Sequence, residues 1–115
     1  MIFDLPYPPS VNHYWLAGGH RRFISKAGVK FRRDAGWLIA GRHPKLCKTE
    51  VSVSIYVWPP DKRRRDLDNI LKPLLDVLQY AGVIKDDSQV AELIVRRCDV
   101  KKGGLVQVSV TLLAR

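Results

Sequence analysis

The sequence lacks any long apolar run. None of its windows holds the roughly 18 unbroken apolar residues that a membrane-spanning helix needs, so we expect no contact with a membrane. Residues 1–9 contain no basic segment followed by an apolar stretch, so we expect no signal peptide. The chain has only two cysteines and three histidines, and none has the spacing of a zinc site. We expect Cys47 and Cys98 to be buried thiols in a reducing cytoplasm.

Acidic residues are also scarce. Eleven Asp and Glu stand against twenty Lys and Arg, which gives the 115-residue chain a formal net charge of +9. A small protein with this excess attracts polyanions, and nucleic acid is the usual partner because basic side chains neutralise its phosphates. Charge alone leaves open a basic surface that serves only solubility.

Hydrophobic periodicity predicts one α+β domain over residues 1–115, with a mixed β-sheet packed by two main helices. The expected order is β-α-β-α-β-β, with strands at 1–5, 50–58, 90–98 and 105–113 and helices at 26–40 and 68–80. In the strand at 50–58, valine and isoleucine alternate with polar residues, which is typical of a half-buried strand. The segment 101–104 predicts a hairpin between the last two strands.

The first helix has clear boundaries. Ser25 is a good N-cap and Gly41 a good stop, and one face collects four apolar residues, Phe31, Ala35, Leu38 and Ile39. Before this helix, Gly18 and Gly19 are expected at the tip of a turn that leads into a short strand at 21–24. These signals place the helix directly after an irregular N-terminal region.

The start of the second helix bears on function. Pro73 belongs near a helix start, because a later position would remove a hydrogen bond and cause a clash. This favours Asp68 or Asn69 over Asp66 as the N-cap. Gly82 is expected to close the helix.

Five of the eleven acids gather in residues 66–87: Asp66, Asp68, Asp76, Asp86 and Asp87. Carboxylates grouped in a basic protein repel one another and the DNA that the rest of the surface attracts, and a bound divalent cation would offset that cost. Mg²⁺ takes a few carboxylates, keeps several waters and binds phosphate oxygens. The cluster therefore predicts a metal site for phosphodiester hydrolysis.

Spacing supports this hypothesis. Asp66 and Asp68 are two residues apart, so both side chains point the same way in extended chain. Lys72 lies one helical turn beyond Asp68, where its charge could stabilise the phosphate that is attacked. Each element also has a structural interpretation: an N-cap, an Asp68–Lys72–Asp76 surface ion-pair ladder, or turn chemistry at Asp86-Asp87.

Basic residues lie beside these acids and on the first helix. We expect the following to contact DNA phosphates: Arg63, Arg64, Arg65, Lys26, Lys30, Arg32 and Arg33. The aromatic residues Tyr7, Tyr14 and Trp15 could stack on opened bases, or equally could belong to the core or to a dimer interface.

Taken together, these motifs resemble the RusA family of Holliday junction resolvases. The resemblance is carried by Lys62–Asn69 with Lys72 close behind, by Asp86-Asp87, and by Leu5–Ser10 followed by Asn12. It spans essentially the whole chain.

The resemblance implies a specific activity. It identifies Asp66, Asp68 and Asp87 as catalytic carboxylates that bind metal and Lys72 as the catalytic lysine, with Asp86 and Asn69 as candidate assisting residues. It implies a homodimer that uses Mg²⁺, with Mn²⁺ as a substitute, and resolves four-way DNA junctions by paired symmetric nicks in recombination and repair. It also implies a bacterial or prophage-encoded protein of the cytoplasm, associated with the nucleoid. Two alternatives remain open: a non-catalytic DNA- or RNA-binding module, and a nuclease that prefers flaps or forks.

Overall fold

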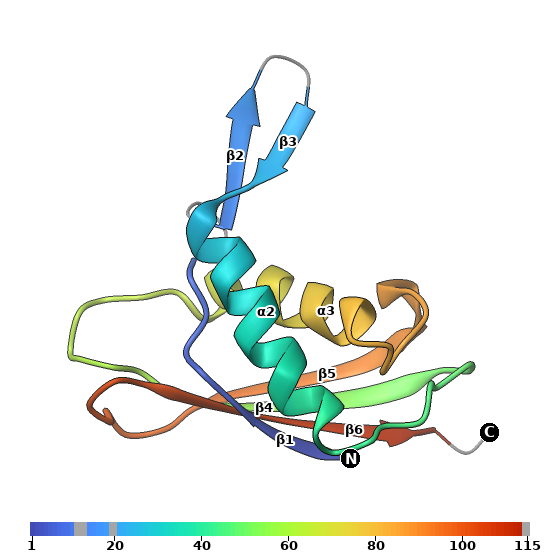
Figure 1. Cartoon of the computed structure of the whole chain (residues 1–115). Coiled ribbons are helices and arrows are strands. Elements are labelled where there is room, and N and C mark those ends of the chain that lie inside the picture. Colours follow the sequence, from blue (N-terminus) through green and yellow to red (C-terminus); the bar gives the residue numbers. More distant parts are fainter. Residues whose placement is uncertain (11–13, 19–20, 114–115) are drawn as a thin grey trace.

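A four-stranded mixed sheet carries two helices on one face, as the computed structural model shows for residues 1–10, 14–18 and 21–113 (Figure 1). The strands are β1 (Ile2–Leu5), β4 (Val51–Trp58), β5 (Val90–Arg97) and β6 (Leu105–Leu112), in the spatial order β1-β6-β4-β5. The helices are α2 (Lys26–Ala40) and α3 (Leu71–Tyr80). The predicted α+β class and both main helices are confirmed.

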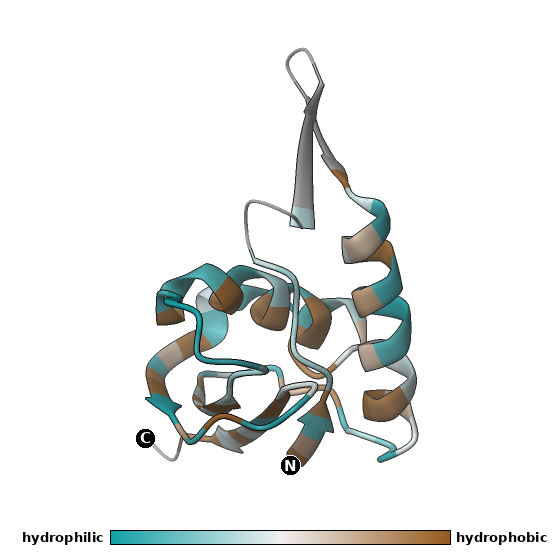
Figure 2. Ribbon diagram, turned by 90° about the vertical axis from the view of Figure 1, so that its left-hand side faces the viewer, coloured by the Kyte–Doolittle hydropathy of each residue, from teal (hydrophilic) through white to brown (hydrophobic). Residues whose placement is uncertain are grey.

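The core lies between the sheet and the helices. Alternate residues of β4 are buried, and those of β6 and β1 that stand beside them in register face the same way, so the three strands present one continuous apolar surface. Helix α2 packs on it through Phe31, Ala35 and Ile39. Apolar and polar residues alternate along both helices (Figure 2). Leu38 is 49% exposed, so its predicted place on the buried face is wrong.

The connection between β5 and β6 differs from the predicted hairpin. β5 pairs with β4 in parallel, and β6 lies on the other side of β4, so the segment 98–104 crosses the end of β4. The Cys98 amide donates to the Val57 carbonyl and the Lys101 amide to that of Pro59, at 2.7 and 2.8 Å. The hairpin prediction is wrong because alternation identifies strands without saying which strands are neighbours.

The chain before α2 forms a second, two-stranded sheet. β2 (Trp15–Gly18) pairs with β3 (Arg21–Ile24), and this hairpin projects away from the main sheet (Figure 1). The short strand predicted at 21–24 is confirmed, whereas β2 was not predicted. Gly19, half of the predicted turn, lies outside the described residues, as does Asn12.

The predicted caps of α2 are confirmed in position. The Ser25 hydroxyl accepts a hydrogen bond from the Gly28 amide at 3.0 Å, and Gly41 is the C-cap. Gly41 keeps a right-handed φ of −64°, and the left-handed residue of this turn is His43. Cys47 is buried as expected, but Cys98 is only half-buried. No helix in the described ranges combines the length and apolar character that crossing a bilayer requires.

Candidate active site

Asp66 and Asp68 lie where the chain passes from the end of β4 into α3. Here a 3-10 turn, η1 (Leu67–Ile70), precedes the α-helix, with Asp66 as its N-cap and Ile70 as the N-cap of α3. Neither cap makes a side-chain hydrogen bond. The prediction that Asp68 or Asn69 caps the helix is therefore wrong, because the extra 3-10 turn moves the helix start beyond both.

The two carboxylates are left available by this arrangement. Asp66 and Asp68 are both exposed, and neither carboxylate makes a hydrogen bond or ion pair to another described residue, although their backbone carbonyls accept from the Asn69 and Leu71 amides. Acidic side chains that neither cap a helix nor neutralise a nearby base keep their oxygen lone pairs for a ligand. A carboxylate that binds a metal ion or repels phosphate would be exposed and unpaired in this way. This distinguishes Asp66 and Asp68 from the other acids of the region.

Lys72 and Asp87 meet although fifteen residues separate them. The Lys72 ammonium lies 3.4 Å from Asp87 Oδ2, and both side chains are about half exposed. Asp87 opens a second 3-10 turn, η2 (Asp87–Gln89), which contacts α3 before β5 begins. This contact places Asp87 beside the first turn of α3.

The oxygen donors of this region suit a hard cation. Among the residues that the structure describes, no group of three or more His, Cys, Asp or Glu stands close enough to hold a metal ion. Mg²⁺ commonly uses one or two carboxylates and completes its shell with waters and substrate phosphates. Two unpaired aspartates therefore fit such an ion in chemistry, and a shell that also includes Asp87 stays a prediction.

Asp86 has a structural role. Its carboxylate accepts a hydrogen bond from the Ser88 amide at 3.0 Å. In turn, the Asp86 amide donates a hydrogen bond to Gln89 Oε1 at 2.9 Å. This reciprocal pair is a capping box. The hydrogen bond from Ser88 lowers the pKa of Asp86. The interpretation of Asp86 as turn chemistry is confirmed, and the box fixes the turn that presents Asp87.

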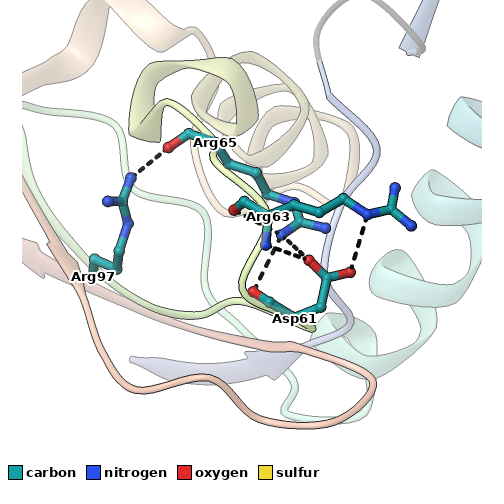
Figure 3. A network of polar contacts seen from close by, with 4 residues as sticks. All are labelled: Asp61, Arg63, Arg65 and Arg97. Atoms are coloured by element: carbon teal, nitrogen blue, oxygen red, sulfur yellow. Dashed lines mark hydrogen bonds and ion pairs between the residues drawn. The ribbon is translucent and has the colours of Figure 1, made fainter.

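An ion-pair network holds the loop that leads into Asp66 (Figure 3). Arg65 Nη1 lies 2.6 Å from Asp61 Oδ1, and the Arg63 amide donates to the same oxygen at 2.9 Å. Hydrogen bonding from Arg65 holds the pKa of Asp61 at about 2. From β5, Arg97 donates to the Arg65 carbonyl at 2.5 Å, one peptide before Asp66. Neither Asp61 nor Arg97 was a predicted site residue.

Tyr7 forms one wall of a basic hollow beside this loop. The Arg65 guanidinium lies 5.8 Å from the centre of the Tyr7 ring, and burial raises the pKa of Tyr7. The hollow, of about 410 Å³, is lined by Tyr7, by the loop up to Asp66 and by the chain that follows β5. A second hollow of about 340 Å³, which shares Tyr7 and Arg63–Asp66 with the first, includes Asn69.

The predicted DNA-contacting cations fall into two groups. Five are exposed, and two are held by carboxylates: Lys26, Lys30, Arg33, Arg63 and Arg64 belong to the first group, and Arg32 and Arg65 to the second. In the exposed group Lys30 and Arg33 make surface pairs with Asp34, at 3.6 and 3.4 Å, and Arg63 makes one with Asp61 at 3.7 Å. The exposed group is free to reach phosphates, whereas the other two first support the fold.

Asp76 contacts α2 instead of Lys72. Its Oδ2 accepts hydrogen bonds from the Tyr14 hydroxyl and from Arg32, whose Nη2 lies at 2.9 Å. Arg32 also lies 4.9 Å above the Tyr80 ring. The predicted surface ladder is wrong at Asp76, and Tyr14 is a core residue. Tyr7 is half-buried, and the Trp15 side chain lies outside the described part of the structure.

Comparisons with known proteins identify the family of this chain. Residues 6–112 match the model of the family described as endodeoxyribonuclease RusA. A crossover junction endodeoxyribonuclease rusA of Enterobacteria phage HK97 is 43% identical over 112 residues, which cover 95% of this chain and 92% of the relative. The proteins of that name from Enterobacteria phage 82 and Escherichia coli K12 are 37% and 35% identical, over 93% of this chain and 90% of each relative.

The matched region begins at Pro6 and ends at Leu112, so it takes in every element described above except β1. The chain therefore belongs to the RusA endodeoxyribonuclease family. Its candidate active site is the junction between η1 and α3, with Lys72 and Asp87 beside it.

Proposed function

We propose that this single-domain protein is a Mg²⁺-dependent, structure-selective endodeoxyribonuclease that resolves four-way DNA junctions by paired symmetric nicks. The observation that carries the proposal is the pair of exposed, unpartnered carboxylates at Asp66 and Asp68, beside the Lys72–Asp87 contact, in a chain of the RusA family. The names of its relatives, crossover junction endodeoxyribonucleases, support the choice of a branched DNA substrate.

Asp66, Asp68 and Asp87 are the residues that would hold the metal ion. A bound Mg²⁺, or Mn²⁺ in its place, activates a water and neutralises charge that develops on the phosphate. The protein supplies the remaining positive charge. Lys72 already lies 3.4 Å from one of these carboxylates, so its ammonium can stabilise the phosphate under attack at the same place.

Exposed basic side chains would position the DNA around this site. Arg63 and Arg64 precede Asp66 directly, and Lys26, Lys30 and Arg33 lie on α2. Phosphate contacts of this kind fix where the backbone lies and carry no sequence information. Their number predicts binding that weakens steeply with salt.

Two equal cuts in a two-fold junction call for two equal sites, which a homodimer with two-fold symmetry provides. We therefore propose a homodimer that acts on junction DNA at the nucleoid of a bacterial cell. The capping box at Asp86 and the arginine network before Asp66 would act as supports that hold the site in shape.

Competition between substrates tests the proposal. A labelled synthetic four-way junction incubated with Mg²⁺ should give nicks at symmetric positions in two strands of like polarity. Unlabelled junction should compete at least about tenfold better than linear duplex or a replication fork of equal length. Equal competition by a fork or flap would replace the junction with that substrate, and binding without nicks in either Mg²⁺ or Mn²⁺ would leave a non-catalytic module.

The metal requirement has a separate test. Close carboxylates repel one another, so Mg²⁺ should bind weakly to the protein alone and more tightly once DNA phosphate completes its shell. Isothermal titration of Mg²⁺ into Lys72→Ala, which keeps the three carboxylates and should leave the junction uncut, can compare free and junction-bound protein. Equal affinities in the two titrations would contradict the proposed site.

A further inference from the structure

A hollow of about 770 Å³ lies at the end of the sheet where β4 begins. Its lining consists of the segment 42–49, which joins α2 to β4, together with Met1 and residues 110–112 at the end of β6. We call this hollow the sheet-end groove. The hollow beside Tyr7 measures about 410 Å³ and has no lining residue in common with it, so the two are separate features.

The sheet-end groove combines an apolar floor with basic side chains. Two lining residues, Cys47 and Val110, are buried, and three large apolar ones stay 42–57% exposed: Met1, Leu46 and Leu112. The lining also holds four exposed basic residues, Arg42, His43, Lys45 and Lys48, and no acid is among the described residues that form it. An exposed apolar surface rimmed by polar side chains commonly marks an interaction site.

Hydrogen bonds fix one wall of the groove. The Cys47 amide donates to the Val83 carbonyl at 2.8 Å. Gln89 Nε2 donates to the carbonyls of Cys47 and Thr49, at 2.8 and 2.9 Å. Because the segment 42–49 is already ordered, a ligand would not have to order it, which lowers the entropic cost of binding.

The groove lies away from the loop that leads into Asp66. It borders the start of β4, whereas this loop follows Trp58 at the other end of the strand. Eight strand residues at about 3.3 Å each separate the two by roughly 25 Å. Figure 1 shows the start of β1 and the end of β6 at one end of the sheet and the loop after β4 at the other. A partner in the groove would therefore leave this loop open to DNA.

We propose that the sheet-end groove binds an acidic, extended segment of another protein, whose one or two large apolar side chains rest on the apolar floor. Carboxylates of that segment would meet Arg42, Lys45 and Lys48, while its apolar side chains would cover Leu46 and Leu112. A rim with basic residues and no acid is complementary to negative charge. Apolar anchors that are buried inside such a polar rim carry most of the affinity of a protein interface.

Other occupants match only part of the groove. Contacts to DNA phosphates use basic side chains and have no need of an apolar floor. A second copy of this chain has a net charge of +9, so it would bring positive charge to a basic rim, which opposes association there. An acidic segment with apolar side chains satisfies both the rim and the floor.

Three labelled peptides test the chemistry of the ligand by fluorescence anisotropy. The first, Gly-Asp-Asp-Leu-Asp-Asp-Phe, should bind with a Kd of about 100 µM or tighter at low salt. The second has Lys in place of each Asp, and the third has Ser in place of Leu and Phe. Each should bind at least about fivefold more weakly, because the second lacks the charge and the third the apolar side chains.

Charge reversal on the rim tests the location. Lys45→Glu/Lys48→Glu should weaken binding of the first peptide about tenfold or more. Lys101→Glu/Lys102→Glu makes the same charge change on exposed residues of the loop between β5 and β6, and should weaken it less than about threefold. Circular dichroism verifies that each variant folds.

Removal of an apolar side chain tests the floor. Leu112→Ser should weaken binding of the first peptide about fivefold or more. Leu38→Ser is the matched control, because Leu38 is 49% exposed on α2 and does not line the groove, whereas Leu112 is 57% exposed. The control variant should bind the peptide as the natural protein does.

Three results would overturn the inference. The first is no binding of the acidic apolar peptide at about 1 mM, or equal binding of all three peptides. The second is an equal loss in the groove and control variants. The third is a different occupant: Lys45→Glu/Lys48→Glu would weaken binding of linear duplex DNA more than the control pair does, or would dissociate an assembly seen in sedimentation velocity. None of the peptide titrations requires Mg²⁺ or a four-way junction, so the inference and the proposed function are tested separately.

Discussion

The guanidinium of Arg97 holds the peptide that precedes Asp66. It donates a hydrogen bond of 2.5 Å to the carbonyl of Arg65, which joins the last residue of β5 to the loop between β4 and η1 (Figure 3). Arg65 is held from its other end by Asp61 at 2.6 Å. Arg97 and Asp61 thus fix the position of Asp66 from two directions, although neither is one of the predicted catalytic residues.

Replacement of Arg97 should reduce cleavage more than binding. Arg97→Gln removes a charge-assisted hydrogen bond, and a small displacement of a catalytic group can cost up to about 100-fold in rate. We expect at least about a tenfold loss in the single-turnover rate of junction cleavage. Lys101→Gln, an exposed residue of the next loop, removes the same charge and should change the rate less than about threefold. Equal losses in both variants would reduce Arg97 to a general contribution to charge.

Asp61 should titrate well below an ordinary aspartate. Its pKa is held at about 2 because it accepts a hydrogen bond from Arg65, with the Arg63 amide as a second donor. A carboxylate with a lowered folded pKa stabilises the fold above its unfolded pKa, and that contribution is lost as the pH falls through about 2. Carboxyl-carbon NMR should place the Asp61 titration near that value and move it upward in Arg65→Gln. An unchanged titration in the variant would remove Arg65 as the cause.

The Tyr14–Asp76–Arg32 cluster should stabilise the fold. Asp76→Asn leaves the Arg32 guanidinium, whose side chain is 26% exposed, without its charged partner. The expected loss is about 1–3 kcal/mol in the free energy of unfolding by urea. Asp34→Asn breaks a surface pair with Lys30, whose side chain is 72% exposed, and should cost under about 0.5 kcal/mol. A similar loss in the two variants would mean that Asp76 behaves as an ordinary surface acid.

Alkaline pH acts on the same cluster. Burial and the hydrogen bond to Asp76 raise the pKa of Tyr14 to about 12. Because the folded value lies above the unfolded value near 10, the contribution of Tyr14 is complete below pH 10 and is lost as the pH rises through about 12. Absorbance titration of the phenols should therefore show a tyrosine that ionises near pH 12, and this step should be absent in Tyr14→Phe.

Two adjacent glycines should differ in their tolerance of a side chain. Both have positive φ, 85° at Gly103 and 74° at Gly104, but a Cβ at Gly104 would lie 2.7 Å from the Cβ of Tyr7, whereas one at Gly103 meets nothing within 4 Å. Gly103→Ala should cost roughly 1 kcal/mol of stability for its backbone alone. Gly104→Ala should cost roughly 1–3 kcal/mol more because Tyr7 must move. Equal losses in urea unfolding would argue against a tight contact between Tyr7 and Gly104.

Local patterns predicted the elements well. The alternation at 50–58 identified β4, and Ser25 and Ala40 mark the observed limits of α2. What the sequence did not provide is the order of the strands. The crossing of 98–104 over β4 depends on contacts between distant segments, and a glycine-containing turn between two strands is equally compatible with a hairpin.

The sequence pointed to the acidic residues of the candidate site but not to the residues that hold the loop before Asp66 in place. Spacing and resemblance pointed to Asp66, Asp68, Lys72 and Asp87, and the structure brings the last two together. Asp61 and Arg97 gave no signal, because their roles depend on a loop geometry that only the folded chain creates. Asp76 was assigned to a helical ladder because its real partners, Arg32 and Tyr14, come from segments at least 44 residues away.

Junction cleavage by Asp68→Asn tests the central claim most directly. The substitution keeps the size of the side chain and removes the charge that would bind the metal ion. We predict that the variant binds a four-way junction at least as tightly as the natural protein and cuts it at least about 1000-fold more slowly in Mg²⁺, a loss equal to about 4 kcal/mol. Asp99→Asn, which removes the same charge from an exposed loop, should cut normally. Cleavage by Asp68→Asn at a rate near that of the natural protein would contradict the assignment of the η1–α3 junction as the active site.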